Sequence, residues 1–361
     1  MSANAVKKKG NSGIVQLLIP LVALGILVLF NLFRDPSFFS IGIKINNSGN
    51  PVLSGNLISI IDSASELAII AMGMTLVTSA CGGQDISVGS VGAISGAVFV
   101  LILKLFPEIT IGTVALGILV SILVTMLFTS FNGMLVSVFR IQPMIATLIL
   151  FSCGRSVAYM FNGGQSTPQV FSDIISAMGM TVPGIPIPTP IFAVAAVGLI
   201  LALIFKFTNL GLYTQSVGIN QGAARLNGIN PTFMKMLSFI ILGACVAVAG
   251  IIGVARMGLV NHKTLLIDIE MDAILAVAIG GNNLGGGKFR VVGSVLGAYI
   301  IQMLTTTLYA MNVAPVNIKA YKAIVIILIV VAGSPVVKRG VTALVKKITA
   351  RNVPAVGKEA A

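Results

Sequence analysis

Long apolar stretches alternate with short polar connections along almost the whole chain. The first stretch, Ile14–Phe33, is about long enough to cross a lipid bilayer. Nine others follow it, many of them interrupted by glycine, proline or hydroxyl residues: Glu66–Ala80, Val88–Lys104, Ile109–Phe131, Met144–Phe161, Ile191–Phe207, Met236–Arg256, Asp272–Gly281, Val291–Met311 and Ala320–Gly333. The pattern predicts an all-α, polytopic membrane protein with about ten transmembrane helices, in a transmembrane domain that covers residues 14–335.

Three segments deviate from simple membrane-spanning helices. The stretches Glu66–Ala80 and Asp272–Gly281 are short for a full crossing, and broken or partly re-entrant helices are tolerated where protein or water surrounds them. Residues 183–190 contain closely spaced prolines, which sustain neither a helix nor a paired central strand. This segment is predicted to be a rigid outer loop, with a platform for an external partner as the alternative.

The composition supports a membrane protein. Charged residues make up 9% of the 361 residues and hydrophobic residues 56%, whereas a soluble domain carries about 25% charged residues. So few polar side chains do not cover the surface of a soluble globule. The composition therefore argues against a soluble enzyme and against a nucleic-acid-binding protein, in spite of the net charge of +13.

The positive charge is expected to report the orientation of the chain, because Lys and Arg are enriched in cytoplasmic loops. Ten spans that start from a cytoplasmic N-terminus place the basic tails, 1–13 and 336–361, both in the cytoplasm. The cytoplasmic side then carries only two acids, Asp85 and Glu359, beside these basic residues: Lys7, Lys8, Lys9, Arg140, Lys206, Arg225, Lys235, Lys288, Arg290, Lys338, Arg339, Lys346, Lys347, Arg351 and Lys358. The outer side carries equal numbers of basic and acidic residues.

The sequence has no convincing motif for catalysis or nucleotide binding. The nearest approach to a phosphate-binding loop is 280–288, but Asn282 replaces the first required glycine and Phe289 the hydroxyl residue that would hold Mg²⁺. The single histidine, His262, is predicted to be a solvated loop residue. The cysteines have no metal or disulfide spacing and are expected to pack as small hydrophobic residues: Cys81, Cys153 and Cys245. We therefore expect no enzymatic activity, no metal and no cofactor bound by this chain.

Several charged residues are predicted at or near membrane depth. Asp62 and Glu66 stand four residues apart, so they share a face at the outer end of the second helix. Arg155 lies within the fifth helix, and buried charges are usually paired. We hypothesise that it neutralises Glu66 or Asp62; the alternative is that it reaches the outer interface. Glu270 and Asp272 open the eighth segment, where acids complement the helix dipole, and the alternative role is to line a substrate mouth.

The most informative polar connection is the stretch 211–231, on the predicted cytoplasmic side. Asn220 is predicted to cap a short helix over 221–226, and Gly228 to end it. A short surface helix with small residues on one side can dock into a groove of another protein. A plain connecting loop is the alternative.

Three motifs, in this order along the chain, resemble those of the ribose-type sugar permeases of ATP-binding-cassette (ABC) importers. Residues 73–90 contain GMTLV and then GGQDISVGS, similar to the GMTLV and GGIDLSVGS signature of that family. The stretch 218–229, GINQGAARLNGI, resembles its cytoplasmic loop, and 270–287, which begins EMDAI and ends LGGG, resembles its third signature. The resemblance covers about residues 57–335.

The chain departs from the family pattern at a few positions. Gln84 stands where the family usually has isoleucine, and an amide there is expected to alter local packing or hydrogen bonding. Other differences from common family forms are Asn282, Asn283 and Lys288. The segment 141–150 is most similar to permeases for pentoses, galactose or galactofuranose.

The resemblance implies a permease in the bacterial plasma (inner) membrane that translocates a monosaccharide delivered by an extracytoplasmic binding protein. It implies a separate cytoplasmic ATPase subunit that binds the ATP, and a second permease subunit, in a homodimer or a heterodimer within the lipid. It assigns coupling to the ATPase to Gly218, Asn220, Ala223, Ala224, Arg225 and Gly228. It assigns signature or gating roles to Gly82, Gly83, Asp85, Ser87, Gly89, Ser90, Glu270, Asp272, Gly280 and Gly281.

Hydroxyl and amide side chains on the predicted helices are candidates for a substrate path, with helix–helix hydrogen bonding as the alternative for each: Asn132, Thr147, Gln302 and Thr305. Two other classes of transporter stay open as alternatives. One is an ABC permease for branched-chain amino acids or nucleosides. The other is an ion-coupled secondary transporter, which would use intramembrane carboxylates such as Asp62, Glu66 and Glu270.

Overall fold

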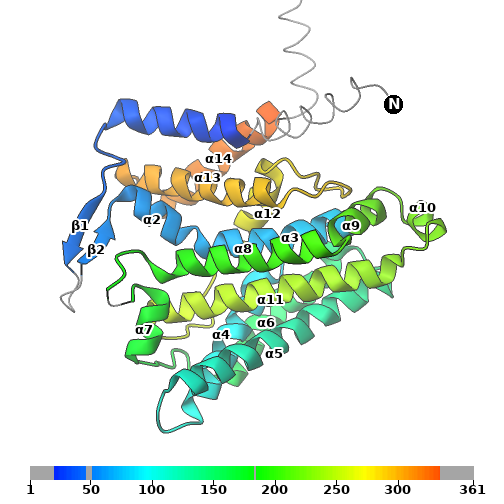
Figure 1. The fold of residues 1–361 in the computed structure, drawn as a ribbon, viewed down its shortest axis with the longest axis horizontal. Coiled ribbons are helices and arrows are strands. Elements are labelled where there is room, and N and C mark those ends of the chain that lie inside the picture. The colour runs from blue at the N-terminus through cyan, green and yellow to red at the C-terminus, as the bar shows by residue number, and fades with distance from the viewer. Residues whose placement is uncertain (1–19, 46–50, 183, 334–361) are drawn as a thin grey trace, which may run out of the picture.

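Helices make up most of the part of the protein that a computed structural model describes, residues 20–45, 51–182 and 184–333 (Figure 1). An N-terminal helix, Pro20–Arg34, is followed by α2 Asn56–Ser63, α3 Ser65–Cys81, α4 Val88–Lys104, α5 Ile111–Ser137, α6 Pro143–Phe161, α7 Asp173–Gly179, α8 Thr189–Phe207, α9 Leu210–Ile219, α10 Gln221–Leu226, α11 Pro231–Met257, α12 Ile269–Ile279, α13 Val291–Ala310 and α14 Pro315–Gly333. The predicted basic tails, 1–13 and 336–361, lie outside the described residues.

The predicted all-α class is confirmed in that the structure is mostly helical, but one small pair of strands was not predicted. Strands β1 (Gly42–Ile45) and β2 (Pro51–Ser54) form a small antiparallel hairpin, in which Gly42 lies opposite Ser54. The proline-rich segment packs beside this hairpin, because the N–H of Leu53 donates to the carbonyl of Pro186 at 2.9 Å. Helix α8 already starts at Thr189, so Pro190 lies in its first turn, where a missing N–H costs nothing.

The connections between the helices gather at two opposite ends of the helical body (Figure 1). One end, called here the hairpin end, carries β1, β2 and α7. The other, called the α10 end, carries α9 and α10. The long helices run between these ends, so the chain passes repeatedly from one to the other.

Helices α3 and α11 form the centre of the body and pack against each other. Every residue of α3 from Ser65 to Ala80 is buried, as expected for a helix that is apolar on all sides. Glycines allow α11 to approach its neighbours closely. A Cβ at Gly243 would overlap the hydroxyl of Thr129 in α5, and a Cβ at Gly250 would lie 2.5 Å from the carbonyl oxygen of Gly92 in α4. Small residues at such crossings are typical of helix packing within membranes.

Within the described part of the chain, five helices are long and apolar enough to cross a membrane: α5, α6, α8, α11 and α13. Helices α2 and α3 make a sixth candidate together, although the pair is bent by 40°. This break lies near the predicted short second segment, and α12, with 11 residues, stays short as well. A mostly helical, multi-pass membrane fold is therefore confirmed, while the count of ten spans and the cytoplasmic termini stay predictions.

Candidate functional site

The connection between α8 and α11 folds into two short helices at the α10 end. Asn220 separates α9 from α10, and its Oδ1 accepts hydrogen bonds from the N–H groups of Gly222 (2.9 Å) and Ala223 (3.1 Å). The chain leaves α10 through Gly228, whose φ of 77° suits glycine. The predicted cap at Asn220, the helix over 221–226 and its end at Gly228 are confirmed.

Helix α10 has one buried residue and an exposed outer surface. Ala224 is 3% exposed and lies in a hydrophobic cluster with these residues: Leu76, Leu210, Val217 and Met234. Ala223 and Arg225 are exposed, and the side chain of Leu226 is 91% exposed. A partner at this end would therefore meet Ala223, Arg225 and Leu226, whereas Ala224 fixes α10 to the body.

Residues 82–90, called here the signature loop, form a buried polar cluster between α4, α5 and α6. Asp85 Oδ1 accepts hydrogen bonds from the N–H (2.7 Å) and the hydroxyl (2.6 Å) of Ser87. Asn132 donates from Nδ2 to the hydroxyl of Ser87 at 3.0 Å. The N–H of Ile86 donates to the hydroxyl of Thr147 at 3.2 Å. The structure thus brings Asn132 to the side chain of Ser87 and Thr147 to the backbone of Ile86, within the signature.

This cluster retains unused hydrogen-bond acceptors. Asp85 Oδ2 and Asn132 Oδ1 are buried and have no partner among the described residues. Carboxylate and amide oxygens accept hydrogen bonds from hydroxyl groups, but both residues are fully buried in this conformation, so a ligand reaches them only if the surrounding helices move apart. Two further signature residues are structural neighbours of α6: Gly83 lies against Pro143, and Ser90 donates to the carbonyl of Phe151 at 2.9 Å.

The third signature begins in α12 and contacts the signature loop. Glu270 and Asp272 both lie in the first turn of α12, as predicted for acids at a helix start. Glu270 is 4% exposed, and its carboxylate occupies the space that a Cβ on Gly89 would take. Asp272 instead accepts from Lys322 of α14 at 2.7 and 2.8 Å. The two acids therefore point to different partners.

The end of α12 is held by backbone packing and by one asparagine. Gly280 lies against the backbone of Gly293, and Gly281 has a φ of 84°. Asn282 donates to the hydroxyl of Ser294 at 2.9 Å and accepts from the N–H of Arg290 at 2.8 Å.

The hydroxyl of Ser294 also lies 2.6 Å from that of Thr75, in the GMTLV motif. Asn282 therefore connects the first and third signatures, a role that the sequence alone did not reveal.

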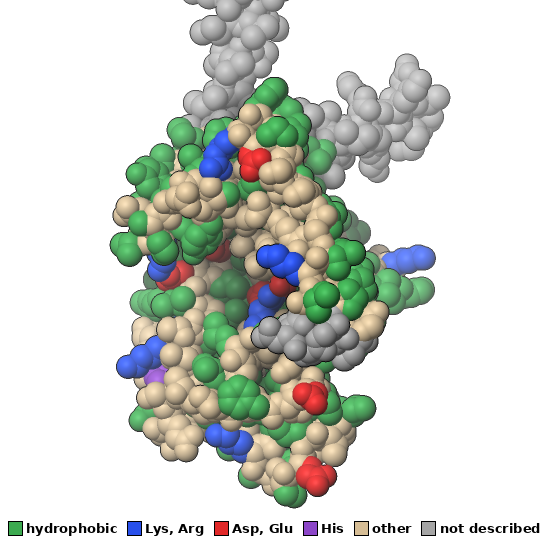
Figure 2. All heavy atoms as spheres, turned by 90° about the vertical axis from the view of Figure 1, so that its left-hand side faces the viewer, with side chains coloured by type: hydrophobic (Ala, Val, Ile, Leu, Met, Phe, Trp, Pro, Cys, Tyr) green, Lys and Arg blue, Asp and Glu red, His purple; other side chains and the backbone are tan. Residues whose placement is uncertain are grey.

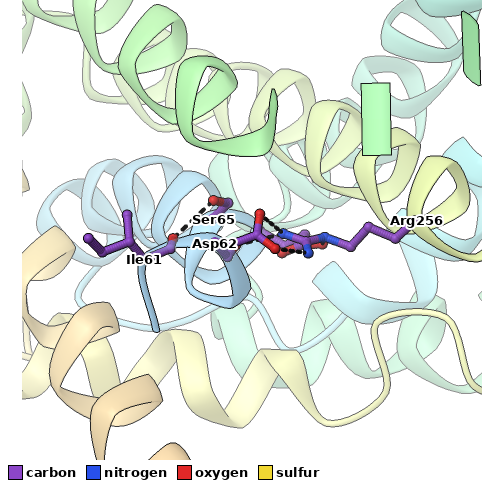
Figure 3. A network of polar contacts seen from close by, with 5 residues as sticks. Ile61, Asp62, Ser65 and Arg256 are labelled. Carbon is purple, nitrogen blue, oxygen red and sulfur yellow. Dashed lines mark hydrogen bonds and ion pairs between the residues drawn. The ribbon is translucent and has the colours of Figure 1, made fainter. Parts of the chain in front are cut away.

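A cluster of charged side chains joins α11 to α2 and α3 at the hairpin end (Figure 3). Arg256 lies 2.6 Å from Asp62 through Nη1 and 2.6 Å from Glu66 through Nε. Asp62 and Glu66 do face the same partner, although the break after Ser63 puts them in different helices. The side chains of this cluster are 11–23% exposed. Sequence analysis missed Arg256, which ends the predicted seventh span.

The hypothesis that Arg155 neutralises Glu66 or Asp62 is wrong. Arg155 donates from Nη1 to the carbonyl oxygens of His262 (2.8 Å), Lys263 (3.2 Å) and Leu265 (3.1 Å). It thereby holds the connection between α11 and α12. Arg155 lies on α6, which packs against α4 and α5, whereas α3 packs against α11. Asp62 and Glu66 therefore lie beside Arg256 of α11 and not beside Arg155.

A cavity of about 700 Å³ opens at the hairpin end beside this ion cluster. Its lining includes Asp62, Arg256 and the polar residues Asn56, Ser59 and Thr181. Figure 2 looks onto this end and shows the hollow, with acidic and basic side chains inside it. The cavity is large enough for a small polar molecule.

Other predicted residues lie apart from these sites. Gln302 and Thr305 are half-buried on α13, which packs on α3 and α12 and not beside the cluster of Asn132 and Thr147 (Figure 1). His262 is not solvated as predicted. It is 7% exposed, and its ring lies 4.9 Å from that of Tyr159, because the loop folds back over α6.

The remaining chemical expectations concern cysteines and ligands. Cys245 is buried and Cys81 half-buried, as expected for small hydrophobic residues, whereas Cys153 is exposed on the candidate membrane span α6. In the described part of the chain, no group of three or more His, Cys, Asp or Glu residues could hold a metal ion.

Residues 56–333 match the family described as "Branched-chain amino acid transport system / permease component". The chain is also similar to individual permeases over most of its length. The "Galactofuranose transporter permease protein YtfT" of Escherichia coli (strain K12) is 33% identical over 317 residues, which cover 87% of this chain and 88% of that protein.

Two further relatives cover as much of the chain. The "Fructose import permease protein FruF" of Bifidobacterium longum (strain NCC 2705) is 34% identical over 340 residues, 92% of this chain and 93% of that protein. The "Ribose import permease protein RbsC" of Escherichia coli (strain K12) is 32% identical over 312 residues, 86% of this chain and 91% of that protein. No solved structure matches the chain.

Proposed function

The chain belongs to the family of branched-chain amino acid transport system permease components, and we propose that it is the membrane-spanning subunit of an ABC importer for a monosaccharide. The observation that carries this proposal is the near full-length similarity to permeases named for galactofuranose, fructose and ribose. The chain is accordingly a multi-pass protein of the bacterial inner membrane. ATP would be bound by a separate subunit.

The α10 end is proposed to face the cytoplasm. Basic residues gather in the connections of this end and in the helix turns beside them, at the predicted cytoplasmic positions: Arg140, Lys206, Arg225, Lys235, Lys288 and Arg290. An excess of Lys and Arg marks cytoplasmic loops. In this orientation ten passages through the membrane leave both termini inside, and the hairpin end faces the extracytoplasmic binding protein.

The exposed surface of α10 is proposed to contact the ATPase subunit. Its position at one end, its N-cap at Asn220 and the 91% exposure of Leu226 support this contact. A short helix with an exposed apolar residue fits the groove of another protein. The ATPase would then move α10, and the permease would open alternately to each side.

The substrate is proposed to enter at the cavity of the hairpin end and to pass the polar cluster around Asp85. The unused acceptors of Asp85 and Asn132 support contacts with sugar hydroxyls, whereas the positions of Gln302 and Thr305 on α13 favour helix packing. A second permease subunit would form the other side of the substrate path, and lipid would surround the two subunits. Exposed apolar side chains on the outer helices α5, α6 and α8 suit such surroundings.

Uptake by reconstituted complexes tests this proposal. The chain is placed in liposomes with an importer ATPase and a sugar-binding protein from the same organism, and uptake of radiolabelled ribose, fructose, galactose and leucine is measured. We expect ATP-dependent, vanadate-sensitive uptake of a sugar, which ionophores leave unchanged. Leucine uptake alone would contradict the sugar assignment. Ion-driven uptake by the chain without its ATPase would contradict the ABC assignment.

A surface variant tests the contact of α10 with the ATPase. Leu226→Asp is expected to weaken binding of the ATPase while the folded chain is retained, because this side chain touches little of the body. Thr110→Asp, at the predicted outer end of α5, is the control on the opposite side. Equal binding of the ATPase to both variants and to the unchanged chain would contradict the contact.

A further inference from the structure

Helix α9 meets the rest of the protein through backbone atoms at Gly218. A Cβ at this position would overlap the carbonyl oxygen of Ser79, near the end of α3, and would lie 2.7 Å from the backbone nitrogen of Gly287. Residues 284–287 are called here the glycine loop. The N–H of Gly287 itself donates to the carbonyl of Ser79 at 3.0 Å. Three segments that are far apart in the sequence thus converge on one carbonyl group.

The glycine loop continues this contact to the signature loop. Gly82 ends α3 with a φ of 64°, and a Cβ there would lie 2.8 Å from the carbonyl oxygen of Gly285. Gly286 has a φ of 91°, and a Cβ added at this position would lie 3.0 Å from Cα of Gly82. Gln84 then donates from Nε2 to the carbonyl of Leu284 at 2.9 Å. The signature loop and the glycine loop are therefore joined by backbone packing and by one amide.

The other end of α9 contacts the same connection through a side chain. A Cβ at Gly211 would lie 2.8 Å from the ring of Phe289. That ring packs edge-on against Phe205 of α8, with the centroids 4.9 Å apart. Helix α9 is therefore held against the α12–α13 connection at both of its ends, once by a backbone contact and once by an aromatic ring.

We infer that Gly218 is the positioning residue through which α9 transmits the movement of α10 to the glycine loop and the signature loop. A side-chain contact can absorb a small displacement by changing rotamer, whereas backbone atoms in contact have no such freedom. The signature loop carries Asp85 and its polar cluster, so a shift of α9 would reach these groups directly. This inference rests on the proposed function, because it requires an ATPase that moves α10.

The test replaces Gly218 by alanine in the reconstituted complex of the permease, ATPase and binding protein. We expect Gly218→Ala to bind the ATPase and to support ATP hydrolysis, while the sugar transported per ATP falls by about tenfold, within the usual range of coupling effects. Gly198→Ala, in α8 and away from both loops, is the control and is expected to keep the normal ratio. Its added Cβ meets only the side chain of Met72, at 3.7 Å.

A measurement on the unchanged chain separates coupling from folding. The amide of Gly287, which donates to the carbonyl of Ser79 at 3.0 Å, is expected to change its rate of exchange with deuterium when ATP binds to the ATPase of the complex. This measurement carries the test if Gly218→Ala reduces the amount of folded chain. Unchanged exchange at Gly287, or a normal ratio in folded Gly218→Ala, would overturn the inference. A wild-type complex without ATP-driven uptake would instead overturn the proposed function.

Discussion

The guanidinium of Arg256 donates two hydrogen bonds, of 2.6 and 3.0 Å, to the carboxylate of Asp62, which lies 194 residues earlier in the chain. Its Nε lies 2.6 Å from Glu66 as well. Arg256→Met would leave two carboxylates without their partner in a partly buried site. We expect it to lower the free energy of unfolding by about 3 kcal/mol, measured by denaturation in detergent. Lys319→Met is the control: Lys319 pairs with Asp268 at the exposed surface, where water screens the ion pair, so a much smaller change is expected.

A double-mutant cycle decides which arginine neutralises Glu66. Arg256→Met and Glu66→Gln are expected to show a coupling energy of about 1–3 kcal/mol, because the two groups touch. Arg155→Met and Glu66→Gln are expected to be additive, because Arg155 donates to backbone carbonyls instead. Coupling between Arg155 and Glu66 as large as that of the first pair would contradict the structure.

Two adjacent asparagines are expected to differ sharply in their contribution to stability. Asn282→Ala removes the partner of the Arg290 N–H and of the Ser294 hydroxyl in a buried network. We expect a loss of about 2 kcal/mol in the free energy of unfolding, typical of buried polar groups left without partners. Asn283→Ala is the matched control. The hydrogen bonds of Asn283 stay within an exposed turn, to Gly285 and Gly286, so a much smaller loss is expected.

The cap at Asn220 is expected to determine how firmly α10 is folded. Asn220→Ala removes the acceptor for two backbone N–H groups, which costs a helix about 1 kcal/mol. Hydrogen exchange of the amides in 222–227 should therefore accelerate about fivefold. Asn220→Asp keeps the acceptor and is expected to leave exchange unchanged. Equal protection in the alanine variant would show that the hydrophobic contacts of Ala224 alone hold α10.

Local features of this fold follow from the sequence, and contacts between distant segments do not. The apolar stretches predicted most of the long helices, and the order Asn220, short helix, Gly228 predicted α10, because caps depend on neighbouring residues only. The hairpin was missed because its strands, Gly42–Ile45 and Pro51–Ser54, are too short to produce an alternating pattern.

The candidate site shows the same division. Motif resemblance located Asp85 and Ser87, and hydroxyl and amide chemistry singled out Asn132 and Thr147, which the structure brings together. The predicted partner of Glu66, Arg155, was wrong. The packing of α11 on α3 determines that Arg256 neutralises Glu66, and this packing cannot be read from residue spacing along one helix.

Gln84, where the family usually has isoleucine, supplies the amide that joins the signature loop to the glycine loop. Gln84→Ile would remove the donor to the Leu284 carbonyl, and we expect about 1 kcal/mol less stabilisation of the glycine loop. The amides of Gly286 and Gly287 should then exchange about fivefold faster with solvent deuterium. Gln302→Ile on α13 is the control, because the side chain of Gln302 forms no hydrogen bond among the described residues. Unchanged exchange at Gly286 and Gly287 in Gln84→Ile would mean that the contact of Gly82 with Gly285 holds the two loops together without the amide.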